Sequence, residues 1–313
     1  MKILEPMVPR ISFLSKFFLK LSIYLSLMLG LFKFSSSMNL NNIETAKIML
    51  KACCPKTLRN NLYLQANENY KYLTYKKSKE ILHNEINLID IYGDKTGELN
   101  VEHVFPQSFF KNNTNNKFMK SDLHNLYLCN SKLNRYRQNF KYIDPIEIDS
   151  YFINEKSDKV LDIKGNVIQN NNELISELFH KSGYLMISNK KTKTFIPTGY
   201  SKGKIARSIS YFAIKYNYTD VIDQVIDPLT LIKWNLKDPV SDEEYLKNII
   251  SYKYQKNVNP FIMNSDLMLF AFSDLLDKKF IEDEKFLGEI LLKKRYSYID
   301  PFKSIEYFIS KNE

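Results

Sequence analysis

A strand, a loop, a second strand and a short helix follow one another between residues 100 and 140, and this order constrains the fold more than any other feature. The segment NVEHVFPQSFF (100–110) is rich in Val and Phe, which is typical of a strand. The segment SDLHNLYLC (121–129) predicts a second, shorter strand. NSKLNRYRQNF (130–140) predicts the start of a helix, with Ser131 as its N-cap residue. The fold class is therefore predicted to be α+β, with these elements inside a mainly helical domain.

The first strand carries an acid next to an imidazole, Glu102 and His103. A neutral imidazole accepts a proton readily near pH 7, so His103 is a candidate general base. Glu102 and Asn134 offer hard oxygen atoms, which suit Mg²⁺ or Mn²⁺ better than Zn²⁺. Neighbouring strand residues point to opposite faces, so the two can serve one site only where the strand ends or bulges. Pro106 indicates such an end.

The chain is basic, with 45 Lys and Arg against 35 Asp and Glu and a net charge of +10. This excess favours a polyanion, either nucleic acid or an anionic membrane surface. Two segments concentrate the charge, with seven basic residues and one acid at 110–141, and six basic residues and no acid at 190–207. Together they predict a groove that follows a phosphate backbone. Such contacts read no base sequence, so cleavage of a bound nucleic acid should be largely nonspecific.

Two later segments predict helices. In 203–216 one face is apolar, and the other carries Lys204, Arg207 and Lys215, which are expected to meet phosphates. Ser241 and Glu244 form the sequence pattern of a capping box, which places a helix start at about 242. The residues expected to supply the buried face of this second helix are Leu246, Ile249 and Ile250.

The first 37 residues have the pattern of a signal peptide. Scattered Lys and Arg precede the uncharged run LSIYLSLMLGLF (21–32), and small residues follow it. The run is short for a membrane span, which needs about 20 apolar residues, but a retained anchor within 11–34 is an alternative. A buried N-terminal helix is another. Either targeting interpretation predicts a protein that is secreted or otherwise outside the cytoplasm, with or without a membrane tether.

Four sequence blocks, in order, resemble the endonuclease I family of nonspecific ββα-metal nucleases. They are NVEHVFPQSFF, SDLHNLYLCNSKLNRYRQN, GKIARSISYFAIKY and WNLKDPVSDEEYLKNIISYKYQKNVNPFI. The resemblance implies a hydrolase that cleaves DNA or RNA with a magnesium or manganese ion. It implies that His103 is the general base and that Glu102 and Asn134 are the metal ligands. Arg137 and Asn139 fall in the family's Arg-x-Asn element.

Family members also place an arginine in the loop after the base, and this chain has Lys117 and Lys120 there instead. His124, in SDLHNL, is expected to be structural. The residues expected to contact nucleic acid are Lys117, Lys120, Arg135, Arg137, Asn139, Lys204, Arg207 and Lys215. The chain is expected to divide into residues 1–37 (signal peptide or anchor), 38–95 (helical lead-in), 96–263 (catalytic domain) and 264–313 (helical extension packed on the same domain).

Two alternatives of a different class remain open at this point. The same fold could carry a decayed site and act as a basic module that binds nucleic acid without cleaving it. The basic residues could instead meet anionic lipid at a membrane surface.

Overall fold

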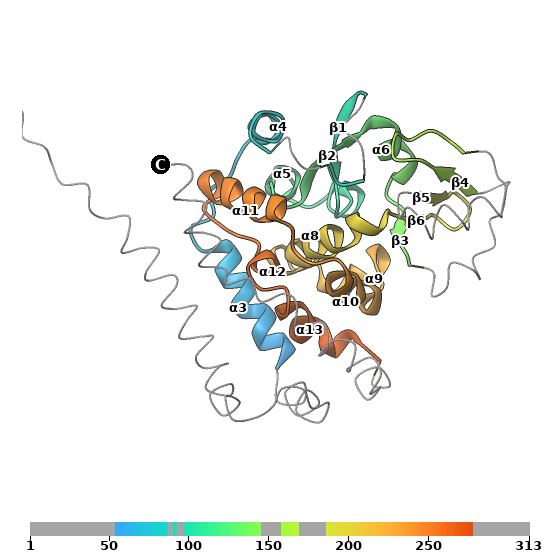
Figure 1. Ribbon diagram of the computed structural model, residues 1–313. Helices are drawn as coiled ribbons and strands as arrows, with labels where there is room; N and C mark the ends of the chain where they lie inside the picture. The colour runs from blue at the N-terminus through green and yellow to red at the C-terminus, as the bar shows by residue number, and fades with distance from the viewer. Residues whose placement is uncertain (1–53, 87–89, 93–96, 145–157, 169–185, 278–313) are drawn as a thin grey trace, which may run out of the picture.

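A two-stranded antiparallel hairpin followed by a helix occupies the segment where the sequence predicts strand, loop, strand and helix (Figure 1). The computed structural model describes residues 54–86, 90–92, 97–144, 158–168 and 186–277. Strand β1 (Leu99–His103) pairs with β2 (Leu126–Asn130), and helix α6 (Ser131–Arg137) follows without a break. The protein therefore has the predicted α+β fold.

The N-cap of α6 differs from the prediction by one residue. Asn130, not Ser131, has the extended backbone of an N-cap, and its side chain accepts a hydrogen bond from the Lys132 amide at 2.9 Å. Ser131 already has helical geometry. Asn and Ser are about equally good N-caps, so the pairing of Asn130 with Leu99 at the end of the hairpin decides between them.

Helix α8 (Lys202–Lys215) lies at the centre of the molecule, as Figure 1 shows. It contacts α3 (Pro55–Asn67), α10 (Pro228–Lys237) and α12 (Pro260–Met263). All its residues from 203 to 215 are buried. The predicted division into an apolar inner face and a basic outer face is therefore wrong. The 3.6-residue periodicity of α8 therefore distinguishes two buried faces of the helix, one apolar and one polar.

Helix α11 (Asp242–Gln255) begins where the capping box predicts, and both hydrogen bonds of the box are present. Its buried face is not the predicted one. Leu246, Ile249 and Ile250 are only partly buried. The fully buried residues of the helix are Glu244, Lys247, Asn248, Ser251 and Gln255. A polar face can turn inward here because most of these side chains pair with polar groups of other elements.

A four-stranded sheet lies beside α6. Its strands are β3 (Lys141–Tyr142), β4 (Asp158–Leu161), β5 (Met186–Asn189) and β6 (Thr194–Ile196), in the order β3-β6-β5-β4. Strand β3 runs parallel to β6, and the other pairs are antiparallel. Ser188 on β5 donates a hydrogen bond to the Tyr136 carbonyl of α6 at 2.7 Å, which ties the sheet to the hairpin unit.

The remaining helices cover the hairpin and α8. Helix α4 (Tyr75–Asn84) contacts β2, and α5 (Asn116–Lys120) lies in the loop between β1 and β2. Helices α9 (Ile222–Val225) and α13 (Leu267–Phe272) complete the set of described α-helices. No helix within the described ranges is long and apolar enough to span a membrane. The predicted signal or anchor segment, 1–37, lies outside the described residues.

Candidate active site

His103 is the last residue of β1, where the strand ends before Pro106. Its Nε2 atom lies 3.0 Å from the carbonyl oxygen of Lys120 at the end of α5. A carbonyl only accepts, so Nε2 carries the proton and Nδ1 carries the lone pair. The imidazole stacks on the Tyr75 ring with centroids 5.8 Å apart. Burial lowers the pKa of His103 to about 4, so the ring is neutral at pH 7 and Nδ1 can accept a proton.

Glu102 is buried, with 2% of its surface exposed. Its Oε1 atom accepts a hydrogen bond from the Tyr92 hydroxyl at 2.8 Å and lies 3.2 Å from the Arg137 guanidinium. Its second oxygen, Oε2, has no hydrogen bond or ion pair among the described residues. Burial raises the pKa of Glu102, although Arg137 and Tyr92 oppose that effect. Tyr92 and Arg137 thus both bind Oε1 of the carboxylate, and Oε2 is left to bind a further partner.

Asn134 lies on α6, at the end of the first turn. It is partly buried, and its Nδ2 donates to the Val101 carbonyl at 3.2 Å, one residue before Glu102. This bond turns the amide nitrogen toward β1 and leaves Oδ1 without a described partner. Oδ1 of Asn134 and Oε2 of Glu102 are both hard oxygen donors, so the chemistry of the pair fits Mg²⁺ or Mn²⁺. The described residues contain no group of three or more His, Cys, Asp or Glu placed to hold a metal.

The structure buries three of the predicted nucleic-acid contacts. Arg137, Arg207 and Lys215 are each at most 1% exposed. Arg137 pairs with Glu102, Arg207 with Glu244 at 2.7 Å, and Lys215 with Asp122 at 2.9 Å. A buried and paired cation cannot reach a phosphate at the surface, so these three predictions are corrected. The ion pair of Arg207 is structural: it joins α8 to α11.

Lys204 is also largely buried, with 8% of its surface exposed. Its ammonium lies over the Tyr200 ring, 5.5 Å from the centroid, and 4.0 Å from a Glu243 carboxylate oxygen. The basic segment 190–207 therefore splits in two. Its last three basic residues are Lys202, Lys204 and Arg207, and they pair with acids. Lys190, Lys191 and Lys193 are exposed in the turn between β5 and β6.

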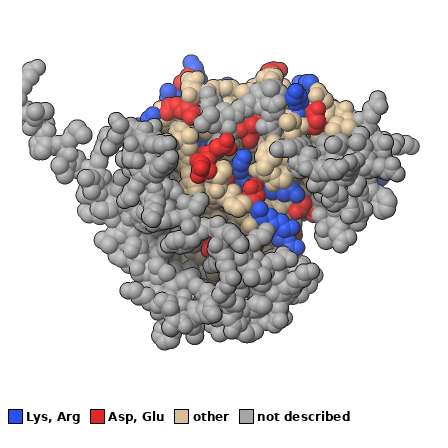
Figure 2. All heavy atoms as spheres, viewed as in Figure 1, with Lys and Arg blue, Asp and Glu red and all other residues tan. Residues whose placement is uncertain are grey.

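Four predicted contacts remain at the surface of the hairpin unit. Lys117, Arg135 and Asn139 are exposed, and Lys120 is partly buried. Lys117 and Lys120 lie on α5, whose last residue, Lys120, contacts His103 through its carbonyl, and Arg135 follows Asn134 on α6. On the face shown in Figure 2 acidic and basic side chains are interspersed, with no uninterrupted basic stripe over the described atoms. Of these four residues, Lys120 is in direct contact with His103, through its backbone carbonyl.

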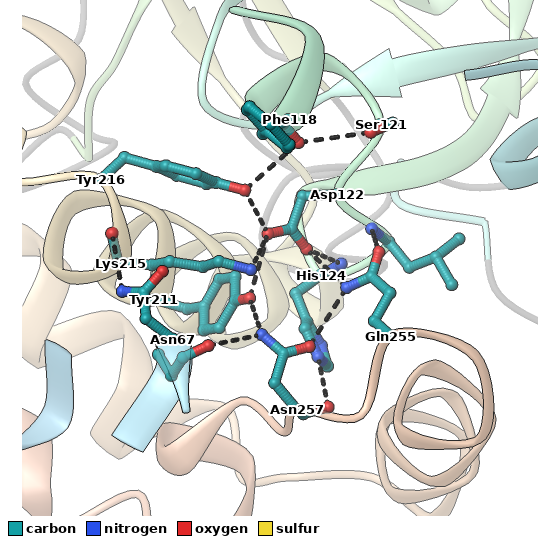
Figure 3. Close-up of polar contacts among 12 residues, drawn as sticks. Asn67, Phe118, Ser121, Asp122, His124, Tyr211, Lys215, Tyr216, Gln255 and Asn257 are labelled. Carbon is teal, nitrogen blue, oxygen red and sulfur yellow. Dashed lines mark hydrogen bonds and ion pairs between the residues drawn. The ribbon is translucent and has the colours of Figure 1, made fainter. Parts of the chain in front are cut away.

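A buried polar network centred on Asp122 supports the segment that carries the Lys120 carbonyl (Figure 3). The Asp122 carboxylate pairs with Lys215 and accepts hydrogen bonds from Tyr211 at 3.0 Å and Tyr216 at 2.8 Å. Gln255 of α11 also donates to it, at 3.1 Å. The network anchors residues 121–124 to α8 and α11. His124, within it, is buried, as expected for a structural residue.

Sequence reasoning missed three contributors to this site: Tyr75, Tyr92 and the Asp122 network. Tyr75 covers the imidazole from α4, and Tyr92 orients Glu102. Both lie outside the strand–loop–strand–helix segment. The aromatic run YKYLTY (70–75) was the only available signal, and nothing in the sequence brings it to His103.

Two comparisons with known proteins bear on this arrangement. The model of the family described as Endonuclease I matches residues 55–266. An extracellular ribonuclease of Bacillus subtilis (strain 168) is 38% identical over 76 residues, which cover 20% of this chain and 26% of that protein. The chain thus matches about a quarter of the length of that relative. The family match includes β1, β2, α6, α8 and α11.

Proposed function

The chain belongs to the endonuclease I family, and on this premise we propose that it is a metal-dependent, largely nonspecific endonuclease that hydrolyses phosphodiester bonds of DNA or RNA. The observation that carries the proposal is a neutral imidazole, His103, that directly follows Glu102 at the end of β1, together with one oxygen each of Glu102 and Asn134 that has no hydrogen bond among the described residues. The name of the extracellular ribonuclease supports a nucleic acid substrate.

In the proposed reaction, Nδ1 of His103 takes a proton from a water molecule. The resulting hydroxide attacks phosphorus, the bond from phosphorus to the leaving oxygen breaks, and that oxygen departs with the bonding electron pair and takes a proton from water. The Lys120 carbonyl keeps the proton of the imidazole on Nε2, and the Tyr75 ring limits its rotation. A base that is held in one tautomer and one orientation needs no reorganisation before the transfer.

Glu102 and Asn134 are the residues that we expect to hold the divalent ion. The ion would supply positive charge next to the phosphate, which develops negative charge during hydrolysis. Arg137 is buried and pairs with Oε1 of Glu102, and this ion pair orients the carboxylate. Because only two protein ligands take part, most of the coordination shell is left for water and phosphate oxygens.

Lys117, Lys120, Arg135 and Asn139 are the proposed contacts to the phosphate backbone. They are accessible, and two of them lie within the loop that also carries the oriented carbonyl. Export from the cytoplasm is part of the proposal, supported by the basic and then apolar start of the chain and by the extracellular relative.

Incubation of the chain with supercoiled DNA and with a structured RNA, with Mg²⁺ or with chelator, tests the proposal. We expect loss of intact substrate only with the metal. Binding without cleavage under every metal condition would instead identify a basic binding module. Binding to anionic vesicles but to neither nucleic acid would identify a membrane-surface protein.

A further inference from the structure

An aromatic and basic surface borders the candidate base. Its members are Tyr72, Tyr75, Lys79, Lys117, Phe118 and Lys120, named here the Tyr72 surface. The Tyr72 and Phe118 rings meet edge to face, with centroids 4.9 Å apart. The Lys117 ammonium lies 6.0 Å from the Tyr72 centroid and 5.1 Å from that of Phe118. Rings and lysines therefore alternate over this part of the molecule.

The surface is joined directly to His103. Tyr75 stacks on the imidazole, and the Lys120 ammonium lies 4.8 Å from the Tyr75 centroid. Lys120 also supplies the carbonyl that accepts from His103. Tyr72 is three residues before Tyr75, and Phe118 is two residues before Lys120. The Cα atoms of Tyr72 and Phe118 therefore lie within about 11 Å of the Cα atoms of Tyr75 and Lys120, the two residues that touch the imidazole.

The exposure of Tyr72 separates it from a core residue. The side chain is 38% exposed, and the lysine beside it, Lys117, is exposed as well. An aromatic ring that stays in water beside ammonium groups has the composition of a surface that binds single strands: a ring for the base and cations for its phosphates. Tyr63 on α3 is also exposed, at 41%, but contacts no described ring or lysine.

We propose that the Tyr72 surface binds an unpaired base next to the scissile phosphate, so that single strands and unpaired loops are the preferred substrates. Duplex bases have both faces covered by their neighbours and cannot stack on Tyr72 without leaving the helix. Lys117 and Lys79 hold the phosphates on either side of the stacked base. The inference rests on the proposed nuclease function and names the substrate class of that same site.

The test compares Tyr72→Ala, Tyr72→Leu and Tyr72→Phe with the wild type, and Tyr63→Leu serves as the matched control. Binding is measured in chelator, so that no cleavage occurs, by fluorescence anisotropy with a short single strand, a blunt duplex and an abasic strand of the same length. Leu keeps an apolar contact with Phe118 but offers no ring, so Tyr72→Leu tests the stack even if Tyr72→Ala does not fold. Phosphatidylglycerol vesicles form a further arm.

We expect Tyr72→Leu to weaken single-strand binding by roughly five- to a hundredfold, the range for the loss of one base–aromatic stack. Duplex and abasic-strand binding should change little, Tyr72→Phe should bind like the wild type, and Tyr63→Leu should have no effect. An equal loss on all three nucleic acids, no loss, or a loss seen only on vesicles would overturn the inference. If the wild type cleaves nucleic acid in Mg²⁺, such a result leaves the nuclease proposal standing. If it neither binds nor cleaves nucleic acid, both proposals fail.

Discussion

Nε2 of His103 lies 3.0 Å from the carbonyl oxygen of Lys120, so a residue 17 positions along the chain fixes the protonation pattern of the imidazole. The carbonyl assigns the proton to Nε2, and burial keeps the second nitrogen unprotonated by lowering the pKa of His103 to about 4. The tautomer of the candidate base therefore depends on a backbone carbonyl, and a sequence motif of side chains does not show this contact.

Replacement of this imidazole tests its role. We expect His103→Ala to lose cleavage by about 10²- to 10⁴-fold, the usual cost of removing a general base, while binding to nucleic acid in chelator persists. Added imidazole should restore part of the activity. His83→Ala on the exposed side of α4 is the control and should cleave normally. Near-normal cleavage by His103→Ala would exclude the residue from the mechanism.

Of the two proposed metal ligands, Asn134 is the better one to test by mutation. Asn134→Ala should raise the Mg²⁺ concentration needed for half-maximal cleavage by at least about tenfold, because one of two protein ligands is lost. Asn60→Ala, on the exposed side of α3, is the matched control. Glu102→Ala is a poorer test because it leaves Arg137 buried without its partner, which costs about 3–5 kcal/mol of stability. Full activity of the wild type in excess chelator would contradict the metal proposal.

Binding to the phosphate backbone should depend only on exposed Lys and Arg side chains. Lys117→Gln combined with Arg135→Gln should weaken binding to every sequence alike. It should also reduce the salt dependence, by about 0.7 to 0.9 in the slope of log affinity against log salt for each lost phosphate contact. Lys237→Gln, an exposed lysine at the end of α10, controls for net charge. If the slope of log affinity against log salt is unchanged in the double variant, residues other than Lys117 and Arg135 contact the phosphates.

The buried pair of Lys215 and Asp122 should contribute to stability and not to substrate binding. Lys215→Met leaves the Asp122 carboxylate buried without its cation, and we expect the free energy of unfolding to fall by about 3–5 kcal/mol. Chemical denaturation followed by circular dichroism measures this change. Lys77→Met removes one partner of an exposed pair with Glu80 and should have little effect. A normally stable Lys215→Met protein with a reduced salt slope would restore Lys215 as a phosphate contact.

Stability should fall as the pH falls from about 6.5 toward the carboxyl range, because His124 is neutral in the folded protein. Burial lowers its pKa to about 3 from an ordinary 6.5, although Asp122 opposes the effect. Lys247 and Lys215 also face the ring, and Tyr211 packs on it. The unfolded chain thus binds more protons across this window, so protonation favours unfolding, by at most about 1.4 kcal/mol per pH unit for one group.

Denaturation curves at several pH values check the slope. His124→Gln should make it shallower, and His83→Gln on the surface should not. An identical slope in wild type and His124→Gln would show that the ring is not kept neutral by folding. Nδ1 of His124 is buried and has no hydrogen-bond partner among the described residues, which is the structural reason for the expected neutrality.

The local elements were predictable because local chemistry decides them. The first hairpin strand follows from the Val- and Phe-rich segment 100–110, its end from Pro106, and the start of α11 from Ser241 and Glu244. The shift of the α6 cap to Asn130 was not predictable, because two good capping residues stand side by side.

The roles of the charged residues were less predictable because a sequence does not show which charges meet. Lys215 and Asp122 are 93 positions apart, and Arg207 and Glu244 are 37 apart, so each looks like a solvated charge until the fold brings the pair together. Periodicity alone placed the basic side of α8 outside. It could not detect that a second polar helix face, that of α11, covers the same region.

The complete burial of α8 affects how any large-scale mutagenesis of this protein would have to be interpreted. In a screen that reads only activity, positions along α8 should be as intolerant as His103, because a change in the central helix removes the folded protein instead of the chemistry. The two classes separate when the yield of folded protein is scored beside activity. Ranked by activity alone, Arg207 would pass for a catalytic residue although it lies entirely inside the protein.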